Sequence, residues 1–365
     1  MAVLSEHIAL NGICPYFTMF PLDFPLRILR KWATNGDWVL DPFCGRGTTN
    51  LAARLLGLPS LGVDSNPVAT AITASKLVDT TVEDIMREAR EILAESLSAA
   101  VPEGEFWKWA YHRDTLEGLC RFREALLLDC RSPARIALRG IILGALHGPK
   151  QKAFPGYFSN QCPRTYAPKP AYSISFWKDR GLKPQPVDVL AVIERRAIRY
   201  YSNLPTGIGV CQLADSRRPG SIQSAAPREG FRWIITSPPY YGMRTYRPDQ
   251  WLRNWFLGGP ETVDYSNDDQ VVHSGPEVFA ADLRAVWKNI AEVSASNARM
   301  VIRFGGISDR RVDPLEIIKD SLKGSGWRIQ TIRHAGNASH GKRQADAFLR
   351  GQSKPLAEFD IWAVN

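Results

Sequence analysis

The stretch DWVLDPFCGRGTTNLAARLLGLPSLGVDSNP, residues 37–67, decides the fold. The apolar run Asp37–Phe43 is typical of a short buried strand, and Thr48–Leu56 has the pattern of a following helix. Leu61–Asp64 is a second short apolar segment that ends in an acid. It precedes a helix expected near Pro67–Leu77, since proline is tolerated in the first turn of a helix. This order predicts a βαβ start and therefore a parallel α/β sheet.

The alternation of strands and helices resumes in the second half of the chain. Strand patterns occur near Gly209–Leu213, Trp233–Thr236, Arg299–Phe304, Trp327–Arg333 and Glu358–Val364. Helical patterns occur at Glu83–Ala100, Leu116–Leu128, Ile136–Leu146, Val187–Tyr201, Val278–Ser294 and Pro314–Lys323. Together they predict an α/β fold with a seven-stranded doubly wound, Rossmann-like sheet, split in sequence by a helical, loop-rich lobe.

The inserted lobe carries the charge of the protein. The chain has 365 residues and a formal net charge of +9, and residues 121–200 alone hold 15 Lys and Arg against 5 Asp and Glu. Residues 149–186 combine prolines, basic residues and aromatics, so we expect no helix to run through them. A localised basic excess predicts a polyanion partner, which in the cytoplasm is most often nucleic acid.

Several classes of protein are excluded by composition. No apolar run approaches the roughly 18 residues of a membrane span, and the amino terminus lacks a secretory signal, so we expect a cytoplasmic protein without a membrane partner. The six cysteines form no CxxC pair and have no metal-ligand spacing, so neither a disulfide framework nor a metal site is predicted. We expect these cysteines to be buried thiols.

A glycine turn follows the first strand. DPFCGRGTT, Asp41–Thr49, lies at the edge where doubly wound sheets bind ligands, and Gly45 and Gly47 permit positive backbone angles and close approach of a ligand. Asp64, at the end of the next strand, is placed to accept hydrogen bonds from two ribose hydroxyls. A plain tight turn, with Asp64 capping the helix at Asn66–Pro67, explains the same pattern.

A second loop, TSPPYYG at Thr236–Gly242, follows another apolar strand. Its two prolines fix an extended backbone without N–H donors. An exocyclic aromatic amine needs two hydrogen-bond acceptors and a stacking platform, which Ser237, the carbonyl of Pro238 and the ring of Tyr240 could supply. The alternative without a functional role is a Pro-Pro turn with a surface tyrosine.

Taken together, DPFCGRGTT, Asp64 in LGVDSNP and the SPPY loop resemble the amino-methyltransferases that use S-adenosylmethionine to methylate exocyclic amines of DNA bases. PYFTMFPLDFP (Pro15–Pro25) is similar to the family's segment over the methionine end of the cofactor. VCQLADS (Val210–Ser216) is similar to its third strand, with Asp215 near the adenine. The resemblance implies a methyltransferase catalytic domain at residues 1–80 and 205–365, with a target-recognition region inserted at 81–204.

The site residues follow from these motifs. The resemblance implies a catalytic loop of Ser237, Pro238, Pro239 and Tyr240. It implies a cofactor site of Phe17, Thr18, Asp41, Pro42, Phe43, Cys44, Gly45, Gly47, Thr48, Thr49, Asp64, Ser65, Asp215 and Ser216. For DNA contacts we expect Lys150, Lys152, Arg164, Tyr166, Lys169, Lys178, Arg244, Lys342 and Arg343, with Pro163–Tyr172 as the recognition loop. Simple solvation of a long basic loop is the alternative.

The first residue of the SPPY loop favours one base. Serine there is commoner among the family's cytosine-N4 methylases, whereas aspartate or asparagine is commoner among adenine-N6 methylases. We therefore expect methylation of cytosine N4 in double-stranded DNA after base flipping, with adenine N6 as the alternative. An RNA amino-methyltransferase and a non-catalytic DNA-binding homologue are further alternatives. We expect a monomer, and any cognate restriction endonuclease would be a separate chain.

Overall fold

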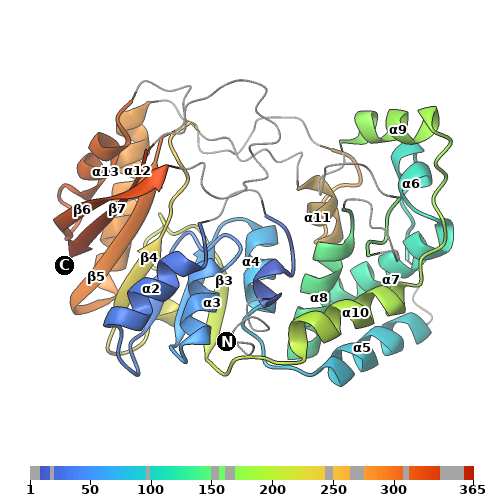
Figure 1. The fold of residues 1–365 in the computed structure, drawn as a ribbon, viewed down its shortest axis with the longest axis horizontal. Helices are drawn as coiled ribbons and strands as arrows, with labels where there is room; N and C mark the ends of the chain where they lie inside the picture. Colours follow the sequence, from blue (N-terminus) through green and yellow to red (C-terminus); the bar gives the residue numbers. More distant parts are fainter. Residues whose placement is uncertain are drawn as a thin grey trace. The chain divides into compact units, whose positions relative to one another are not determined.

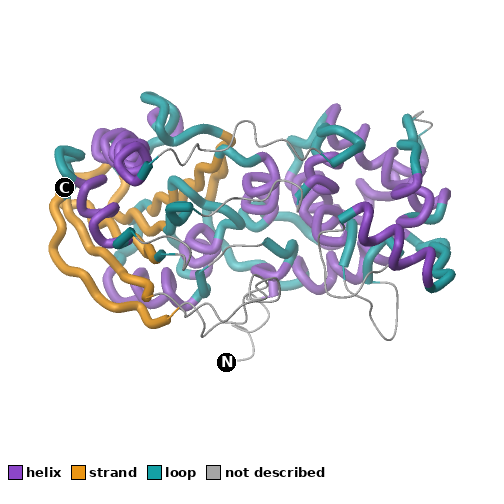
Figure 2. The backbone as a smooth tube through the Cα atoms, turned by 90° about the horizontal axis from the view of Figure 1, so that it is seen from above, coloured by secondary structure: helices purple, strands orange, loops and turns teal. Residues whose placement is uncertain are grey.

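The structure is a computed structural model of the chain. It describes residues 9–16, 20–95, 99–148, 156–160, 169–242, 250–263, 275–306, 312–337 and 357–365. The chain divides into two compact units, each built from three segments. The sheet unit consists of Tyr16–Thr73, Pro205–Thr245 and Asp268–Asn365. The helical unit consists of Met1–Pro15, Ala74–Leu204 and Tyr246–Asn267. All strands of the described residues belong to the sheet unit, and Figure 2 draws them in orange.

The unit boundaries lie close to the predicted domain boundaries. The chain leaves the sheet unit after Thr73 and returns to it at Pro205. The sequence predicted an insertion at residues 81–204. Two further segments, residues 1–15 and 246–267, belong to the helical unit although they lie outside that insertion. The roles predicted for the two regions, catalysis and target recognition, stay predictions.

In its described residues the sheet unit contains seven strands, as predicted (Figure 1). They are β1 (Val39–Asp41), β2 (Ser60–Asp64), β3 (Gly209–Leu213), β4 (Phe231–Thr236), β5 (Ser294–Gly305), β6 (Arg328–Asn337) and β7 (Ala357–Val364). Their order in the sheet is β3-β2-β1-β4-β5-β7-β6. The first five are parallel, and β7 runs antiparallel to both β5 and β6. The predicted fold class is confirmed by this order.

Helices cover both faces of the sheet because its central strands are apolar on both sides. One face carries Leu40, Ile234, Met300 and Ile302, packed with helices α12 (Pro276–Glu292) and α13 (Pro314–Leu322). The other face carries Val39, Trp233, Ile235 and Val301, packed with α2 (Asp23–Trp32) and α3 (Thr48–Leu55). The alternation follows the two-residue period of a strand. The sheet unit also contains the short 3-10 helix η2 (Gln223–Ala225) and helix α4 (Pro67–Ser75), whose end passes into the helical unit.

The helical unit is built from longer amphipathic helices and short aromatic ones. They are η1 (Leu10–Gly12), α5 (Val82–Ala94), α6 (Glu105–Ala110), α7 (Arg113–Leu128), α8 (Pro133–Ala145), α9 (Pro170–Asp179), α10 (Val189–Tyr201) and α11 (Trp251–Phe256). Side-chain caps fix three of the starts: Thr81 accepts from Asp84 N, Ser132 from Arg135 N, and Asp188 from Ala191 N.

One prediction about this unit is wrong. Residues 149–186 were expected to exclude a helix, yet α9 lies among them. Pro170 is at the first turn, where its missing N–H is not needed, and the next proline comes only at Pro184. Ser173 and Trp177 are buried on one face of α9, whereas Tyr172 is 58% exposed. The predicted recognition loop therefore ends on a helix, and its residues 163–168 lie outside the described residues.

In the part of the chain that the structure describes, no helix is both long enough and apolar enough to cross a membrane.

Candidate cofactor and catalytic site

Two loops of the sheet unit begin at neighbouring strand ends. Strand β1 pairs in parallel with β2 on one side and with β4 on the other, so the direction of strand addition reverses between β1 and β4. Ligands of open α/β sheets bind at the carboxyl edge at such a switch point. The glycine turn follows β1 and the SPPY loop follows β4. Both loops therefore start at this edge, as the sequence analysis required.

The glycine turn depends on backbone angles that favour glycine. Gly45 has φ +52° and Gly47 has φ +72°, both in the left-handed region. A Cβ on Gly47 would lie 2.7 Å from Cγ2 of Thr73. Gly47 precedes α3 directly, so the turn leads into the amino terminus of a helix, whose first N–H groups lack partners within the helix. The positive backbone angles predicted for these glycines are confirmed.

Asp64 links the glycine turn to the residue before α4. One carboxylate oxygen accepts from the backbone N–H of Gly45 at 2.9 Å, and the other accepts from the backbone N–H of Asn66 at 2.9 Å. Burial raises the pKa of Asp64, and these backbone hydrogen bonds oppose the rise. Asn66 in turn donates to the Tyr16 hydroxyl at 3.2 Å. Helix α4 is capped by Asn66, whose side chain accepts from the backbone N–H of Val68 at 2.9 Å, so the alternative in which Asp64 caps this helix is wrong. The backbone of Ser65 is a further donor to the Asp64 carboxylate.

Asp41 joins the two loops. Its Oδ1 accepts a hydrogen bond from the Thr236 hydroxyl at 2.7 Å, and from the backbone N–H of Phe43 at 3.2 Å. Its Oδ2 is buried and accepts no hydrogen bond from the described residues. Burial raises the pKa of Asp41 to about 6, against the lowering effect of the Thr236 hydroxyl. A buried acceptor that lacks a donor is suited to an ammonium or hydroxyl group of a ligand.

The SPPY loop leaves β4 with mixed exposure. Ser237 is half-buried, Pro238 is buried and Pro239 is exposed. Tyr240 is buried at 8% exposure and donates its hydroxyl to the Glu358 carboxylate at 2.7 Å. Its ring meets Phe304 edge to face, with centroids 5.2 Å apart. The predicted alternative of a surface tyrosine is therefore wrong, because most of the side chain is buried and the edge-to-face contact with Phe304 orients the ring.

Other predicted cofactor residues make local contacts. The Thr49 hydroxyl donates to the Ile235 carbonyl at 3.0 Å, which links α3 to β4, and Thr48 is also buried. The Ser216 hydroxyl donates to the Pro42 carbonyl at 2.8 Å, so the loop after β3 touches the glycine turn. Asp215 accepts from Arg217, whose guanidinium lowers the pKa of that carboxyl. Phe43 packs edge to face on Trp287, while Ser65 follows β2 directly.

Cys44 lies deep in the turn. Its Sγ is 3.8 Å from the Sγ of Cys211 on β3 and 3.7 Å from the Thr73 hydroxyl. Burial raises the pKa of the Cys44 thiol well above its usual range, so it stays a neutral thiol at physiological pH. Cys14, Cys44 and Cys120 are buried, whereas Cys130 and Cys211 are half-buried. Cys162 lies outside the described residues.

The structure describes two of the residues predicted to contact DNA, Lys169 and Lys178. Lys169 is the residue before α9, and Lys178 pairs with Glu105 and lies over the Trp109 ring. On the exposed face of the same helix, the Tyr172 and Phe176 rings are stacked, and the Arg180 guanidinium lies 4.2 Å from the Phe176 centroid. The other predicted site residues lie outside the described residues: Phe17, Thr18, Lys150, Lys152, Arg164, Tyr166, Arg244, Lys342 and Arg343.

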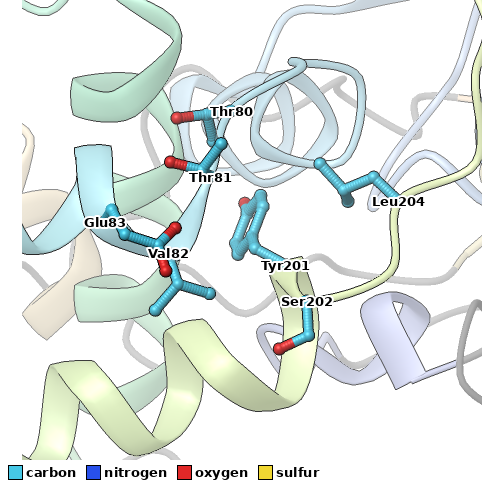
Figure 3. A pocket seen from close by; sticks show the side chains of 7 residues that line it. All are labelled: Thr80, Thr81, Val82, Glu83, Tyr201, Ser202 and Leu204. Atoms are coloured by element: carbon cyan, nitrogen blue, oxygen red, sulfur yellow. The ribbon is translucent and has the colours of Figure 1, made fainter.

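A hollow of the helical unit is separate from these residues. It lies between the start of α5 and the end of α10, and Figure 3 shows Thr80, Thr81 and Glu83 facing Tyr201 across it. Tyr201 donates its hydroxyl to the Ser75 carbonyl at 2.6 Å, and Thr81 caps α5. These groups serve the local fold, and none was predicted as a site residue. Across the described ranges, no group of three or more His, Cys, Asp or Glu is placed to hold a metal ion.

Sequence reasoning missed three residues of the sheet edge. Thr236 precedes the SPPY loop directly, so its position beside the motif could have indicated a role. Arg217 follows Asp215 by two residues and pairs with both Asp215 and Asp282. Glu358 lies 118 residues from Tyr240 in the chain, and nothing in the sequence links the two.

Comparisons of the sequence with known proteins agree with the motifs. Residues 5–75 match the profile of a family described as DNA methylase, whose members are N6 and N4 methyltransferases. The Type II methyltransferase M.MthZI of Methanothermobacter thermautotrophicus is 30% identical over 74 residues, which cover 20% of this chain and 19% of that protein. M.BsoBI of Geobacillus stearothermophilus, also a Type II methyltransferase, is 38% identical over 61 residues, 16% of this chain and 12% of that protein. The chain thus aligns with under a fifth of either relative.

A solved structure described as a SAM-dependent methyltransferase, from Methanosarcina mazei, aligns with 95% of this chain and 98% of its own. Its TM-score is 0.35 and its identity 9%, so the fold assignment rests on the strand order rather than on this alignment. S-adenosylmethionine is the cofactor that the motifs imply, and the DNA methylase match supports it. The predicted resemblance is confirmed: over residues 5–75 this chain is similar to the S-adenosylmethionine-dependent DNA amino-methyltransferases.

Proposed function

We propose that this chain methylates the exocyclic N4 amine of cytosine in double-stranded DNA. The observation that carries the proposal is the shared edge of the sheet unit. The Thr236 hydroxyl, directly before the SPPY loop, is bonded to Asp41 at the start of the glycine turn. A cofactor held by the turn and a base held by the loop would therefore be neighbours, and methyl transfer depends mainly on such positioning.

The residues of the turn fit a sulfonium nucleoside. Gly45 and Gly47 leave the backbone open to a ligand, Asp64 keeps lone pairs for ribose hydroxyls, and Asp41 has a buried acceptor without a donor. When bound, S-adenosylmethionine supplies an electrophilic methyl group on its sulfonium sulfur. Asp41 and Asp64 would hold its polar ends.

The SPPY loop supplies the groups for the base. Ser237 and the carbonyl of Pro238 are proposed to accept the two hydrogens of the amine, which turns the nitrogen lone pair out of the ring plane for attack. The ring of Tyr240 is proposed to stack on the extruded base. No covalent enzyme intermediate is needed, and the proton lost by the methylated amine passes to solvent.

The helical unit is proposed to contact the duplex. Its excess of Lys and Arg would bind phosphates, and Lys169 and Arg180 flank the exposed aromatic face of α9. The proposal names no recognition sequence. Any cognate restriction endonuclease would be a separate chain. The alternative functions are methylation of adenine N6, methylation of RNA and DNA binding without catalysis. The following experiment distinguishes them.

The test is nucleoside analysis of DNA from a methylation-deficient host that expresses the full chain. Mass spectrometry is expected to find N4-methylcytosine, and Ser237→Ala is expected to abolish it with cofactor binding retained by calorimetry. Ser296→Ala, at an exposed serine of β5, is the matched control. N6-methyladenine would correct the base, and methylated nucleosides confined to RNA would correct the substrate. Cofactor binding without any methylated nucleoside would reject catalysis.

A further inference from the structure

Tyr240 and Glu358 form a buried hydrogen bond beside the proposed base site. The Tyr240 hydroxyl donates to Oε1 of Glu358 at 2.7 Å, and the two residues are 8% and 7% exposed. Glu358 comes from β7, the strand that runs between β5 and β6. A strand far along the chain thus reaches the tip of the catalytic-loop tyrosine.

The sheet leaves room for this pair. Glu358 is the register partner of Gly305 on β5 and of Gly336 on β6. A Cβ on Gly305 would lie 3.0 Å from Cγ of Glu358 and 3.3 Å from Cε2 of Tyr240. Glycine at position 305 therefore lets the carboxylate and the ring lie side by side, since a larger residue would push one of them away.

The Tyr240 ring is held at both ends. The backbone after Pro239 holds one end of Tyr240, and Phe304 packs edge to face against the ring. A carboxylate acceptor holds the hydroxyl end, and a hydrogen bond to a charged acceptor is stronger than one to a neutral acceptor. The buried carboxylate also keeps the phenol ring rich in electrons, which favours contact of its face with a positive charge.

We infer that Glu358 is a positioning residue for Tyr240 in the methyl transfer proposed above, on which this inference rests. The amine nitrogen gains a positive charge as its bond to the methyl carbon forms and the carbon–sulfur bond breaks. That charge is shared with the base until a proton leaves. Glu358 stabilises the reacting base through the held, electron-rich ring, so it acts on the chemical step rather than on binding.

The test compares Glu358→Gln, Tyr240→Phe and the double variant of the full chain in steady-state methylation of duplex DNA. Each single variant is expected to lower kcat by about tenfold, because Tyr240→Phe removes the hydrogen bond and Glu358→Gln replaces its charged acceptor with a neutral one. The KM for DNA and the Kd for cofactor should stay at wild-type values. The double variant should be no slower than Tyr240→Phe, because without the Tyr240 hydroxyl the acceptor at position 358 has no bond left to weaken. Glu316→Gln, an exposed glutamate of α13, is the matched control.

The outcomes separate the inference from the proposed function. An active wild type with Glu358→Gln at full kcat would overturn the inference alone, as would single effects that multiply in the double variant. A fall in cofactor affinity and in DNA affinity together with kcat would show a merely structural role. A wild type that methylates no DNA would reject the proposed function, and the inference with it. A double-mutant cycle in urea unfolding reads the bond itself without any turnover, and zero coupling would exclude it.

Discussion

The Thr236 hydroxyl and the Asp41 carboxylate are bonded at 2.7 Å, although 195 residues separate them in the chain. The bond joins the last residue of β4 to the last residue of β1 at the carboxyl edge of the sheet unit. Because each residue starts a loop with a proposed role, this contact and the parallel pairing of β1 with β4 hold the two loop starts together.

Removal of this bond should weaken the fold and raise the pKa of Asp41 further. Thr236→Val keeps the shape of the side chain but leaves Oδ1 of Asp41 without its hydroxyl donor. We expect a loss of about 1–3 kcal/mol in the free energy of unfolding, measured by urea denaturation. Thr331→Val, at an exposed threonine of β6, should change it little. Equal effects at the two sites would contradict the special role of the Thr236 bond.

Asp41 makes stability depend on pH in an unusual direction for a carboxylate. Its pKa is about 6 in the folded protein against 3.8 as the ordinary value, so its contribution is greatest below pH 3.8 and is lost as the pH rises through 6. Asp41→Asn removes this titration. Between pH 4 and pH 7, the variant should gain about 2 kcal/mol in unfolding free energy relative to wild type. A difference that stays constant with pH would show that Asp41 titrates normally.

His147 should act in the opposite direction. Its Nδ1 is 2.6 Å from the Ser159 hydroxyl, and burial lowers its pKa to about 3. The unfolded chain takes up a proton near pH 6.5 and the folded chain does not, so stability present above pH 6.5 is lost on acidification. Relative to His147→Gln, the wild type should lose about 1.4 kcal/mol for each pH unit below 6.5. His334→Gln, at an exposed histidine, is the control, and proton NMR showing His147 protonated at pH 5 would refute the prediction.

Gly47 should tolerate no side chain. Gly47→Ala meets a φ of +72° and places its Cβ 2.7 Å from Thr73, so we expect a loss of about 1–3 kcal/mol together with weaker cofactor binding. Gly57→Ala meets a similar φ of +69° with nothing within 4 Å of its Cβ. The difference between the two variants, measured by thermal unfolding and calorimetry, isolates the contact with Thr73. Equal losses would mean that backbone strain alone matters.

Charge reversal beside α9 should weaken DNA binding in a salt-dependent way. Lys169→Glu with Arg180→Glu removes the cation at the start of α9 and the cation over the half-buried Phe176 ring, which stacks on the exposed Tyr172. If both bind phosphates, the slope of log affinity against log salt should fall by about two. Lys323→Glu, on the exposed end of α13, is the matched reversal. Unchanged affinity in fluorescence anisotropy would favour the view that these cations only solvate the surface.

Local patterns predicted the sheet because each strand and each glycine turn is encoded within a few residues. The DPFCGRGTT turn and the SPPY loop carry their own backbone requirements, so both could be recognised without the fold. The short helix α11 was missed because its aromatic side chains are ordered by tertiary packing, as between Trp107 and Trp255. Helix α9 was missed because the prediction counted the prolines of residues 149–186 and did not consider that Pro170 lies in the first turn, where a helix tolerates proline. The Tyr240–Glu358 bond joins two strands that only the folded sheet brings together.

Each unit is built from segments that are discontinuous in the sequence, and this order affects folding during synthesis on the ribosome. Strand β1 emerges early, but its neighbour β4 follows only after the whole of residues 74–204 has been made. Until then the apolar β1 segment has one long side open to unwanted pairing. A nascent chain halted before residue 231 should therefore engage holdase chaperones through its first strands, and completion of β4 should release it.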